Sequence, residues 1–171
     1  PITSVGIMML WEEDKLGLDD PVSEYIPEFK NPQVLVSVDP LKTRPAKSEI
    51  TIRHLLTHTS GLGYNSTPRI GKFYRDEGVI AGLCSSEMTL SEMMSRAGNV
   101  PIQFDPGTQW QYGFSTDVLG RVIEVASGQS LDEFIAEKIC DPLGMHDTSF
   151  IVPPAKRSRV VAAYVPTEKA I

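Results

Sequence analysis

One stretch of the chain reads Phe104-Asp105-Pro106-Gly107-Thr108-Gln109-Trp110-Gln111-Tyr112-Gly113. Its Pro-Gly pair predicts a sharp turn. Just beyond it, Val118 and Val122 recur at helical spacing, which predicts an amphipathic helix that is capped by Ser115 and ends at Gly128. The stretch therefore predicts a loop that carries two aromatic side chains to the start of a helix.

A second informative stretch reads Ile50-Thr51-Ile52-Arg53-His54-Leu55-Leu56-Thr57-His58-Thr59-Ser60-Gly61-Leu62. His54 and His58 lie four residues apart, on one face of the predicted helix, which is a spacing used in zinc sites. The Glu that follows the first His of a metalloprotease is absent, and no third ligand is evident. We therefore expect no metal, and we expect both histidines to hydrogen-bond to neighbouring backbone and fix a loop.

The remaining pattern predicts a mainly helical unit. Thr89–Glu92 and Ser130–Glu133 have the spacing of capping boxes, and residues 27–48 hold four prolines, which favours a long surface loop. Val160 to Val165 are expected to begin a strand. The expected helices run from Pro1 to Lys15, Val22 to Tyr25, Thr51 to near Gly61, Lys72 to Asp76, Thr89 to Gly98, Ser115 to Gly128 and Ser130 to about Ile139.

The composition is that of an ordinary globular protein. Of the 171 residues, 41% are hydrophobic and 22% are charged. A chain of this length buries roughly 70% of its unfolded surface. The side chains expected in the core are Val5, Met9, Leu55, Leu56, Leu119, Val122, Ile123, Phe134 and Ile135.

Charge and hydropathy argue against two kinds of partner. The net charge is −6, and the longest basic run, Lys156-Arg157-Ser158-Arg159, is too short to indicate nucleic-acid binding. No run approaches eighteen consecutive apolar residues, so we expect no membrane span. Cys84 and Cys140 do not make a disulfide framework, and the compartment stays open.

Tyr112 is the candidate catalytic residue. A tyrosine acts as a general base only when a nearby positive charge makes its phenol more acidic than the ordinary value of about 10. Residue type alone favours aromatic packing of Tyr112 with Trp110 instead. Three nucleophile motifs are absent from the chain: Gly-x-Ser-x-Gly, Ser-x-x-Lys and Lys-Thr-Gly, the last interrupted at Lys42-Thr43-Arg44.

Taken together, these stretches resemble the serine β-lactamase-like hydrolases: class C β-lactamases, D-Ala-D-Ala peptidases and the esterases of the same fold, closest to the family VIII-type esterase branch. Pro106–Glu124 looks like the second motif region, where a Tyr-x-Asn element stands beside the nucleophile. Tyr112 takes the Tyr position, and Phe114 replaces Asn, which is similar to the esterases. Other matching pieces are Leu18-Asp19-Asp20-Pro21-Val22, Tyr25-Ile26-Pro27, His54 to Leu62 and Pro142-Leu143-Gly144-Met145.

The resemblance implies that the chain is the helical region of a larger α+β fold, with the sheet largely outside this chain. Pro1-Ile2-Thr3-Ser4-Val5 looks like the sequence that directly follows the lysine of Ser-x-x-Lys. Proline also fits the first turn of a helix, so the helix is expected to begin just upstream. We therefore expect residues 1–171 to form a single unit truncated at both ends and inactive alone, with the third family motif beyond Ile171.

The function implied by the resemblance is that of a serine hydrolase acting on carboxylic esters through an acyl-enzyme, without a cofactor. The nucleophilic Ser and its Lys would lie upstream of Pro1, with Tyr112 as the catalytic residue of this chain. Two alternatives remain: a β-lactamase or D-Ala-D-Ala carboxypeptidase, and a non-catalytic helical binding module. The expected partners are a small-molecule ester or β-lactam-like substrate and the remainder of the parent chain.

Overall fold

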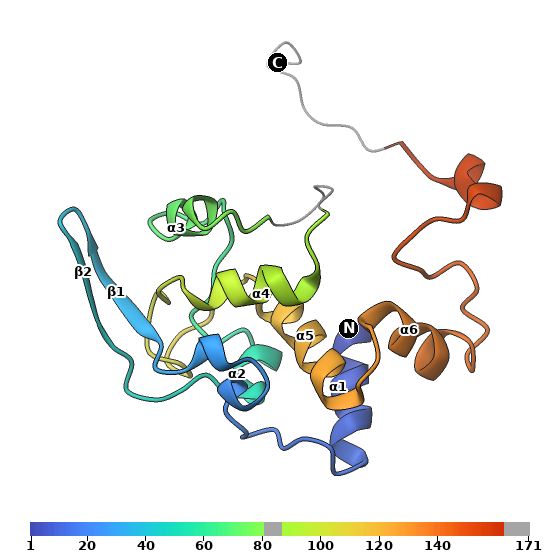
Figure 1. The fold of residues 1–171 in the computed structure, drawn as a ribbon, viewed down its shortest axis with the longest axis horizontal. Coiled ribbons are helices and arrows are strands. Elements are labelled where there is room, and N and C mark those ends of the chain that lie inside the picture. Colours follow the sequence, from blue (N-terminus) through green and yellow to red (C-terminus); the bar gives the residue numbers. More distant parts are fainter. Residues whose placement is uncertain (81–86, 163–171) are drawn as a thin grey trace.

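The chain forms a helical unit in which one central helix contacts four of the other helices. The computed structural model describes residues 1–80 and 87–162 of the chain. Within these residues it is rich in helix and has one two-stranded sheet (Figure 1). The α-helices are α1 (Ile2–Glu12), α2 (Ile52–Leu56), α3 (Gly71–Asp76), α4 (Leu90–Gly98), α5 (Ser115–Ser127) and α6 (Leu131–Ile135), and the strands are β1 (Gln33–Val38) and β2 (Leu41–Pro45). The short 3₁₀ helices are η1 (Val22–Glu24), η2 (Pro27–Phe29) and η4 (Pro154–Arg159), and η3 (Ala136–Cys140) is a π-helix that continues α6.

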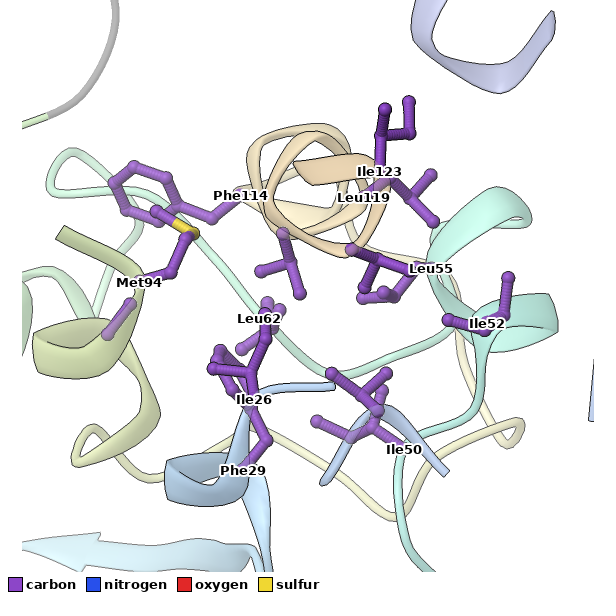
Figure 2. Packing of buried hydrophobic residues seen from close by; sticks show 14 of the residues in the cluster. Ile26, Phe29, Ile50, Ile52, Leu55, Leu62, Met94, Phe114, Leu119 and Ile123 are labelled. Atoms are coloured by element: carbon purple, nitrogen blue, oxygen red, sulfur yellow. The ribbon is translucent and has the colours of Figure 1, made fainter. Parts of the chain in front are cut away.

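Helix α5 is the central element, and α1, α2, α4 and α6 all pack against it. Its apolar side chains recur at helical spacing, which buries Leu119, Val122 and Ile123 on the faces that meet these helices. Figure 2 shows Leu119 and Ile123 close to Leu55 of α2. The helix ends at Gly128, whose φ of 73° is the left-handed conformation that glycine adopts without a steric cost. The predicted helix is confirmed.

Helix α1 packs closely on α5 and α6 because Gly6 has no side chain. A Cβ atom at Gly6 would lie 2.9 Å from Cδ1 of Ile123 and 3.2 Å from Cε1 of Phe134. Ile7 and Leu10 are buried beside it.

The predicted core is confirmed in large part. Met9 and Leu56 are only partly buried, and the prediction for Val5 is wrong, because 47% of that residue is exposed. Val5 lies on a different side of α1 from Ile7 and Leu10, and the described residues do not bury that side. The buried members are Leu55, Leu119, Val122, Ile123, Phe134 and Ile135.

Helix α4 begins as its capping box predicts. The hydroxyl of Thr89 accepts a hydrogen bond from the N–H of Glu92, and the Glu92 carboxylate accepts one from the N–H of Thr89. Helix α2 uses the same reciprocal pattern, with the imidazole of His54 in place of a carboxylate, accepting from the N–H of Thr51 at 3.2 Å. The prediction that His54 binds neighbouring backbone is therefore confirmed.

Two predicted caps are wrong. The side chain of Ser130 makes no capping hydrogen bond at α6. The carboxylate of Glu124, on α5, instead accepts from the N–H of Leu131 at 3.2 Å. The side chain of Ser115 does not cap α5 either, because its hydroxyl hydrogen-bonds to Ser60. At α6 a carboxylate from α5 thus replaces the local cap, whereas at α5 the Ser115 hydroxyl bonds to a residue from another part of the fold.

The predicted loop at residues 27–48 contains a β-hairpin. Strands β1 and β2 pair antiparallel, from Gln33 opposite Pro45 to Val38 opposite Leu41. The prolines lie before, between and at the end of the strands, so they do not interrupt the pairing. Strand β1 is also bonded to the segment before α5, because the N–H of Ile102 donates to the carbonyl of Gln33 at 2.8 Å.

The remaining predictions concern the C-terminal region, the cysteines and the membrane. Residues 160–162 form no strand, and the rest of the expected strand lies outside the described residues. Cys140 is a free, buried thiol, and Cys84 lies outside the described residues. No helix among residues 1–80 and 87–162 is long and apolar enough to cross a membrane.

Replacing Leu119 by Ala should lower the free energy of unfolding by about 2–5 kcal/mol, because the side chain is 1% exposed and its loss leaves a cavity in the packing of α5. Denaturant unfolding measures the change. The control is Val125→Ala on the same helix, where the side chain is 39% exposed and the expected change is within about 0.5 kcal/mol. Equal losses for both variants would contradict the central position of α5.

Candidate active site

Tyr112 lies in the loop directly before α5 and is 54% exposed. Trp110, two residues earlier, is 66% exposed. The two aromatic rings stack with their centroids 6.5 Å apart and an interplanar angle of 27°. Their exposure does not fit a role as buried core residues, so both side chains are available to contact another molecule or another part of the protein.

Backbone hydrogen bonds join this loop to the segment that follows α2. The two stretches singled out in the sequence therefore run side by side. Backbone carbonyls between His58 and Gly63 accept hydrogen bonds from the loop that carries Tyr112. Four bonds connect them: Gln103 N to Gly61 O at 2.9 Å, Gly107 N to Thr59 O at 2.8 Å, Gln111 N to His58 O at 2.9 Å and Phe114 N to Gly63 O at 3.2 Å.

A buried pair of hydroxyl groups connects the same two segments. The Oγ atoms of Ser60 and Ser115 lie 2.9 Å apart, and both residues are fully buried. A buried hydroxyl without a partner is unfavourable, so each serine satisfies the other. Because Ser115 is the first residue of α5, this bond fixes the start of α5 against the segment that follows α2.

Glycine makes the close approach of the two segments possible. A Cβ atom at Gly113 would lie 2.6 Å from the carbonyl oxygen of Leu62 and 2.7 Å from Cα of Gly63. Both contacts are with backbone, which cannot rotate aside as a side chain can. The position directly after Tyr112 therefore requires glycine for this packing.

An ion pair fixes the turn that precedes the aromatic residues. Arg44 of β2 donates two hydrogen bonds to the Asp105 carboxylate, at 2.9 and 2.8 Å. The backbone N–H of Lys47 donates a third, at 3.0 Å. The Arg44 guanidinium and the Lys47 N–H lower the pKa of Asp105 to about 2, because they stabilise its charged form.

The rings around Tyr112 form a cluster that extends toward the core. The ring of His58 lies 4.9 Å from that of Tyr112, and the ring of Tyr64 lies 5.6 Å from it, edge to face. Tyr64 also contacts Phe114 at 4.8 Å, and Phe114 is fully buried. Phe114 stands where the related motif has Asn, so here this position contributes to the core.

Burial keeps two members of this cluster uncharged. It lowers the pKa of His58, which favours the neutral imidazole. It also raises the pKa of Tyr64 to about 12, with a smaller contribution from the nearby Asp117. Burial raises the pKa of Asp117 as well.

The prediction that the His58 side chain hydrogen-bonds to neighbouring backbone is not confirmed. Its backbone carbonyl accepts from Gln111, but its buried Nδ1 atom has no hydrogen-bond partner among the described residues. His54 and His58 thus serve different local structures, one at the cap of α2 and one beside Tyr112. No group of three or more His, Cys, Asp or Glu side chains within residues 1–80 and 87–162 is placed to hold a metal ion.

A cavity of about 750 Å³ lies where α1, α4 and α5 meet. Thr3, in the first turn of α1, lines it together with Thr116 and Asp117 in the first turn of α5. Leu90 and Met93 of α4 supply apolar lining. The cavity thus extends along α5 from its first turn to Glu124 and onto Asp132 of α6, and Tyr112, three residues before α5, is not among its lining residues. That the Tyr112 hydroxyl faces the N-terminal end of α1 stays a prediction.

Sequence patterns did not indicate Tyr64, the Ser60–Ser115 pair or the Arg44–Asp105 ion pair. Tyr64 follows the second stretch by two residues, so its position was a usable signal. Arg44 carries no such signal, because its partner is 61 residues away and it lies in a segment that was predicted to be a loop.

The fold places the chain in a class of proteins. Its helix-rich unit with a two-stranded sheet corresponds to the helical region of the β-lactamase and penicillin-binding-protein fold. A β-lactamase/D-alanine carboxypeptidase from Yersinia pestis, 23% identical, shares this fold with a TM-score of 0.66 over 94% of this chain and 41% of that protein. The sequence matches the family described as Beta-lactamase over residues 1–171, and the chain belongs to that family.

Similar proteins with assigned activities include esterases and acyltransferases. Esterase EstB of Burkholderia gladioli is 37% identical over 160 residues, which cover 94% of this chain and 38% of the esterase. The structure of EstCE1, described as a hydrolase with promiscuous acyltransferase activity, is 34% identical with a TM-score of 0.69, over 84% of this chain and 35% of that protein. The chain therefore spans somewhat more than a third of the length of these relatives.

Replacing Asp105 by Asn should remove a pH-dependent part of the stability. The pKa of Asp105 is lowered in the folded protein, so its ion pair stabilises fully above the ordinary carboxyl value and less as the pH falls toward about 2. The wild type should therefore lose more stability than the variant between about pH 4 and pH 2. Unfolding midpoints measured across this range test the prediction, with the exposed Asp141→Asn as control. Parallel losses in wild type and Asp105→Asn would contradict it.

Proposed function

We propose that residues 1–171 are the helical part of a longer serine hydrolase that acts on carboxylic esters. The observation that carries the proposal is the placement of Tyr112, which is exposed directly before α5 and held by the segment that follows α2. The relationship to EstB, a protein named as an esterase, supports an ester substrate.

The proposed chemistry is acyl transfer through a serine. A Ser and a Lys upstream of Pro1 would lie three residues apart on one face of a helix that continues α1, so that the amine can activate the hydroxyl. The serine would lose its proton and take the acyl group from the ester, and the alcohol would leave with a proton. Water would then release the acid and restore the serine, while the Lys and Tyr112 share the proton transfers. Backbone N–H groups outside residues 1–171 would stabilise the oxyanion. The cavity lined by Thr3 of α1 and by Thr116 and Asp117 of α5 is the proposed space for the substrate.

Phe114 argues against the β-lactamase and carboxypeptidase alternative. In the Tyr-x-Asn element this position carries a polar side chain, whereas here it carries an aromatic ring that is fully buried and packs on Tyr64 and Tyr74. The site therefore lacks at that position the polar group that the alternative would use.

Acyl transfer to an alcohol is a second candidate activity. It is favoured by the description of EstCE1 as a hydrolase with promiscuous acyltransferase activity and by the similarity to acyltransferase calJ of Penicillium decumbens, which is 37% identical over 149 residues, 85% of this chain and 34% of that protein. An alcohol added to an ester hydrolysis assay separates the two activities: a transferase forms the new ester, and a strict hydrolase forms only the acid.

Replacing Tyr112 by Phe in the full-length protein should lower kcat by about 10²–10⁴, the usual contribution of a positioned acid–base group. Folding should be nearly unchanged, because the hydroxyl belongs to a side chain that is 54% exposed. Hydrolysis of a p-nitrophenyl ester and the melting temperature give the two readouts. A fully active Tyr112→Phe variant would refute the proposed role of Tyr112.

Residues 1–171 expressed alone should not hydrolyse esters. Removing a serine nucleophile costs on the order of 10⁶ in kcat, and this stretch contains no Ser-x-x-Lys. The purified polypeptide is assayed with a p-nitrophenyl ester beside the full-length protein. A burst of product together with acylation of a residue within 1–171 would show that the nucleophile lies inside this stretch. A full-length sequence without Ser-x-x-Lys would instead favour the non-catalytic binding module.

A further inference from the structure

His58 occupies a backbone position at which glycine is usual. Its N–H donates to the carbonyl of Leu55 at 3.2 Å. The N–H of Thr59 donates to the carbonyl of His54 at 2.8 Å. These two bonds form the Schellman motif at the end of α2, in which the residue after the C-cap is left-handed and most often glycine. His58 is that residue, with a φ of 54°, so a side chain is present where the local backbone favours none.

The imidazole of His58 packs on the candidate catalytic residue. Its ring centroid lies 4.9 Å from that of Tyr112, with an interplanar angle of 39°, and 6.2 Å from that of Trp110, edge to face. Both separations lie in the range over which ring pairs attract each other. The backbone carbonyl of His58 also accepts from the N–H of Gln111, directly before Tyr112, at 2.9 Å. His58 thus contacts Tyr112 through its ring and holds the adjacent backbone through its carbonyl.

Hydrogen bonding of the buried ring nitrogen does not account for an imidazole at this position. Nδ1 of His58 is buried and has no hydrogen-bond partner within residues 1–80 and 87–162. An unpaired buried polar atom is unfavourable, and so is a left-handed backbone at a residue that has a Cβ atom. Residues that carry local costs of this kind cluster at functional sites. The feature that offsets these costs is the contact of the ring with Tyr112 and Trp110.

A second ring from the same segment restricts Tyr112 as well. The ring of Tyr64 meets that of Tyr112 edge to face at 5.6 Å and packs on the buried Phe114 at 4.8 Å. The carbonyl of Gly63, directly before Tyr64, accepts from the N–H of Phe114 at 3.2 Å. The segment that follows α2 therefore contacts the Tyr112 ring at two points, of which His58 is the nearer.

We propose that His58 is a positioning residue whose ring holds the Tyr112 side chain in the orientation that proton transfer requires. Reaction rates depend steeply on the placement of the reacting groups, and a displacement of about 1 Å can lower a rate by about 10²-fold. The Tyr112 side chain is 54% exposed, so ring contacts are what restrict its rotation. His58 exchanges no proton in this role. The inference rests on the proposed function, because it assigns His58 a role through Tyr112.

The test is His58→Gly in the full-length protein, which removes the ring and keeps the left-handed backbone. Glycine adopts this conformation without a steric cost, which offsets the lost ring contacts, so the melting temperature should stay close to that of the wild type. The kcat for a p-nitrophenyl ester should fall about 2- to 10-fold, the range that corresponds to one aromatic pair. KM should be nearly unchanged, because the ring acts on Tyr112 and not on the ester.

His58→Phe separates the ring from its nitrogen atoms. Phenylalanine keeps a flat ring beside Tyr112 and has no hydrogen-bonding group, so this variant should retain most of the wild-type kcat. A loss of kcat as large as that of His58→Gly would overturn the inference, because it would trace the effect to the nitrogen atoms.

Asp14→Gly is the matched control. Asp14 has a φ of 55° and takes the same position in the Schellman motif at the end of α1. Its N–H donates to the carbonyl of Trp11 at 3.1 Å, and the N–H of Lys15 donates to that of Leu10 at 2.9 Å. Asp14 is exposed, so the same backbone change should leave kcat at the wild-type value. Equal losses of kcat in Asp14→Gly and His58→Gly would overturn the inference, because they would assign the effect to the helix end.

A double-mutant cycle keeps the test decisive if His58→Gly also loses stability. If His58 acts through the Tyr112 hydroxyl, adding His58→Gly to Tyr112→Phe should cause no further loss of kcat. Additive losses would overturn the inference, as would a wild-type kcat in His58→Gly while Tyr112→Phe is impaired. Wild-type activity in Tyr112→Phe would instead refute the proposed function itself, and the inference with it.

Discussion

Burial of Leu119, Val122 and Ile123 fixes α5 among α1, α2, α4 and α6, and the position of every other helix in this group depends on that packing. Gly6 lets α1 approach closely, and Glu124 of α5 caps α6. Because interiors are close-packed, a shift of α5 would disturb each of these contacts together. The same packing determines where the chain enters α5, and therefore where the loop that precedes it must run.

That loop gains its shape from the segment after α2. Four backbone hydrogen bonds, the buried Ser60–Ser115 pair and the close approach at Gly113 hold the two segments together. The backbone on both sides of Tyr112 is therefore held by hydrogen bonds, while its side chain is exposed. A rigid backbone under an exposed polar side chain is what a catalytic residue requires.

Burial and nearby charges shift the pKa values of the groups around Tyr112 in different directions. His58 is favoured as neutral, Tyr64 keeps its proton, and the Arg44–Asp105 pair stabilises opposite charges at the preceding turn. Environments that push ionisation in different directions mark candidate functional sites, although ion pairs that only hold structure produce the same signature. The Arg44–Asp105 ion pair has a structural role, because it joins the hairpin to the turn and does not touch Tyr112.

The sequence alone predicted where most of the helices lie and placed the candidate tyrosine just before α5, but it extended α2 to near Gly61 where the structure ends it at Leu56. Periodicity and the Thr89 cap involve residues three or four apart, so local patterns predicted α4 and α5. Only the tertiary structure decided the hairpin at residues 33–45, the exposure of Val5, the loss of the predicted caps and the contact between Tyr64 and Tyr112. Apart from the hairpin, whose paired residues are near one another in the chain, these depend on residues that are distant in the chain, such as Ser60 and Ser115, which are 55 positions apart. Their pairing follows from how α5 packs, and no local pattern records it.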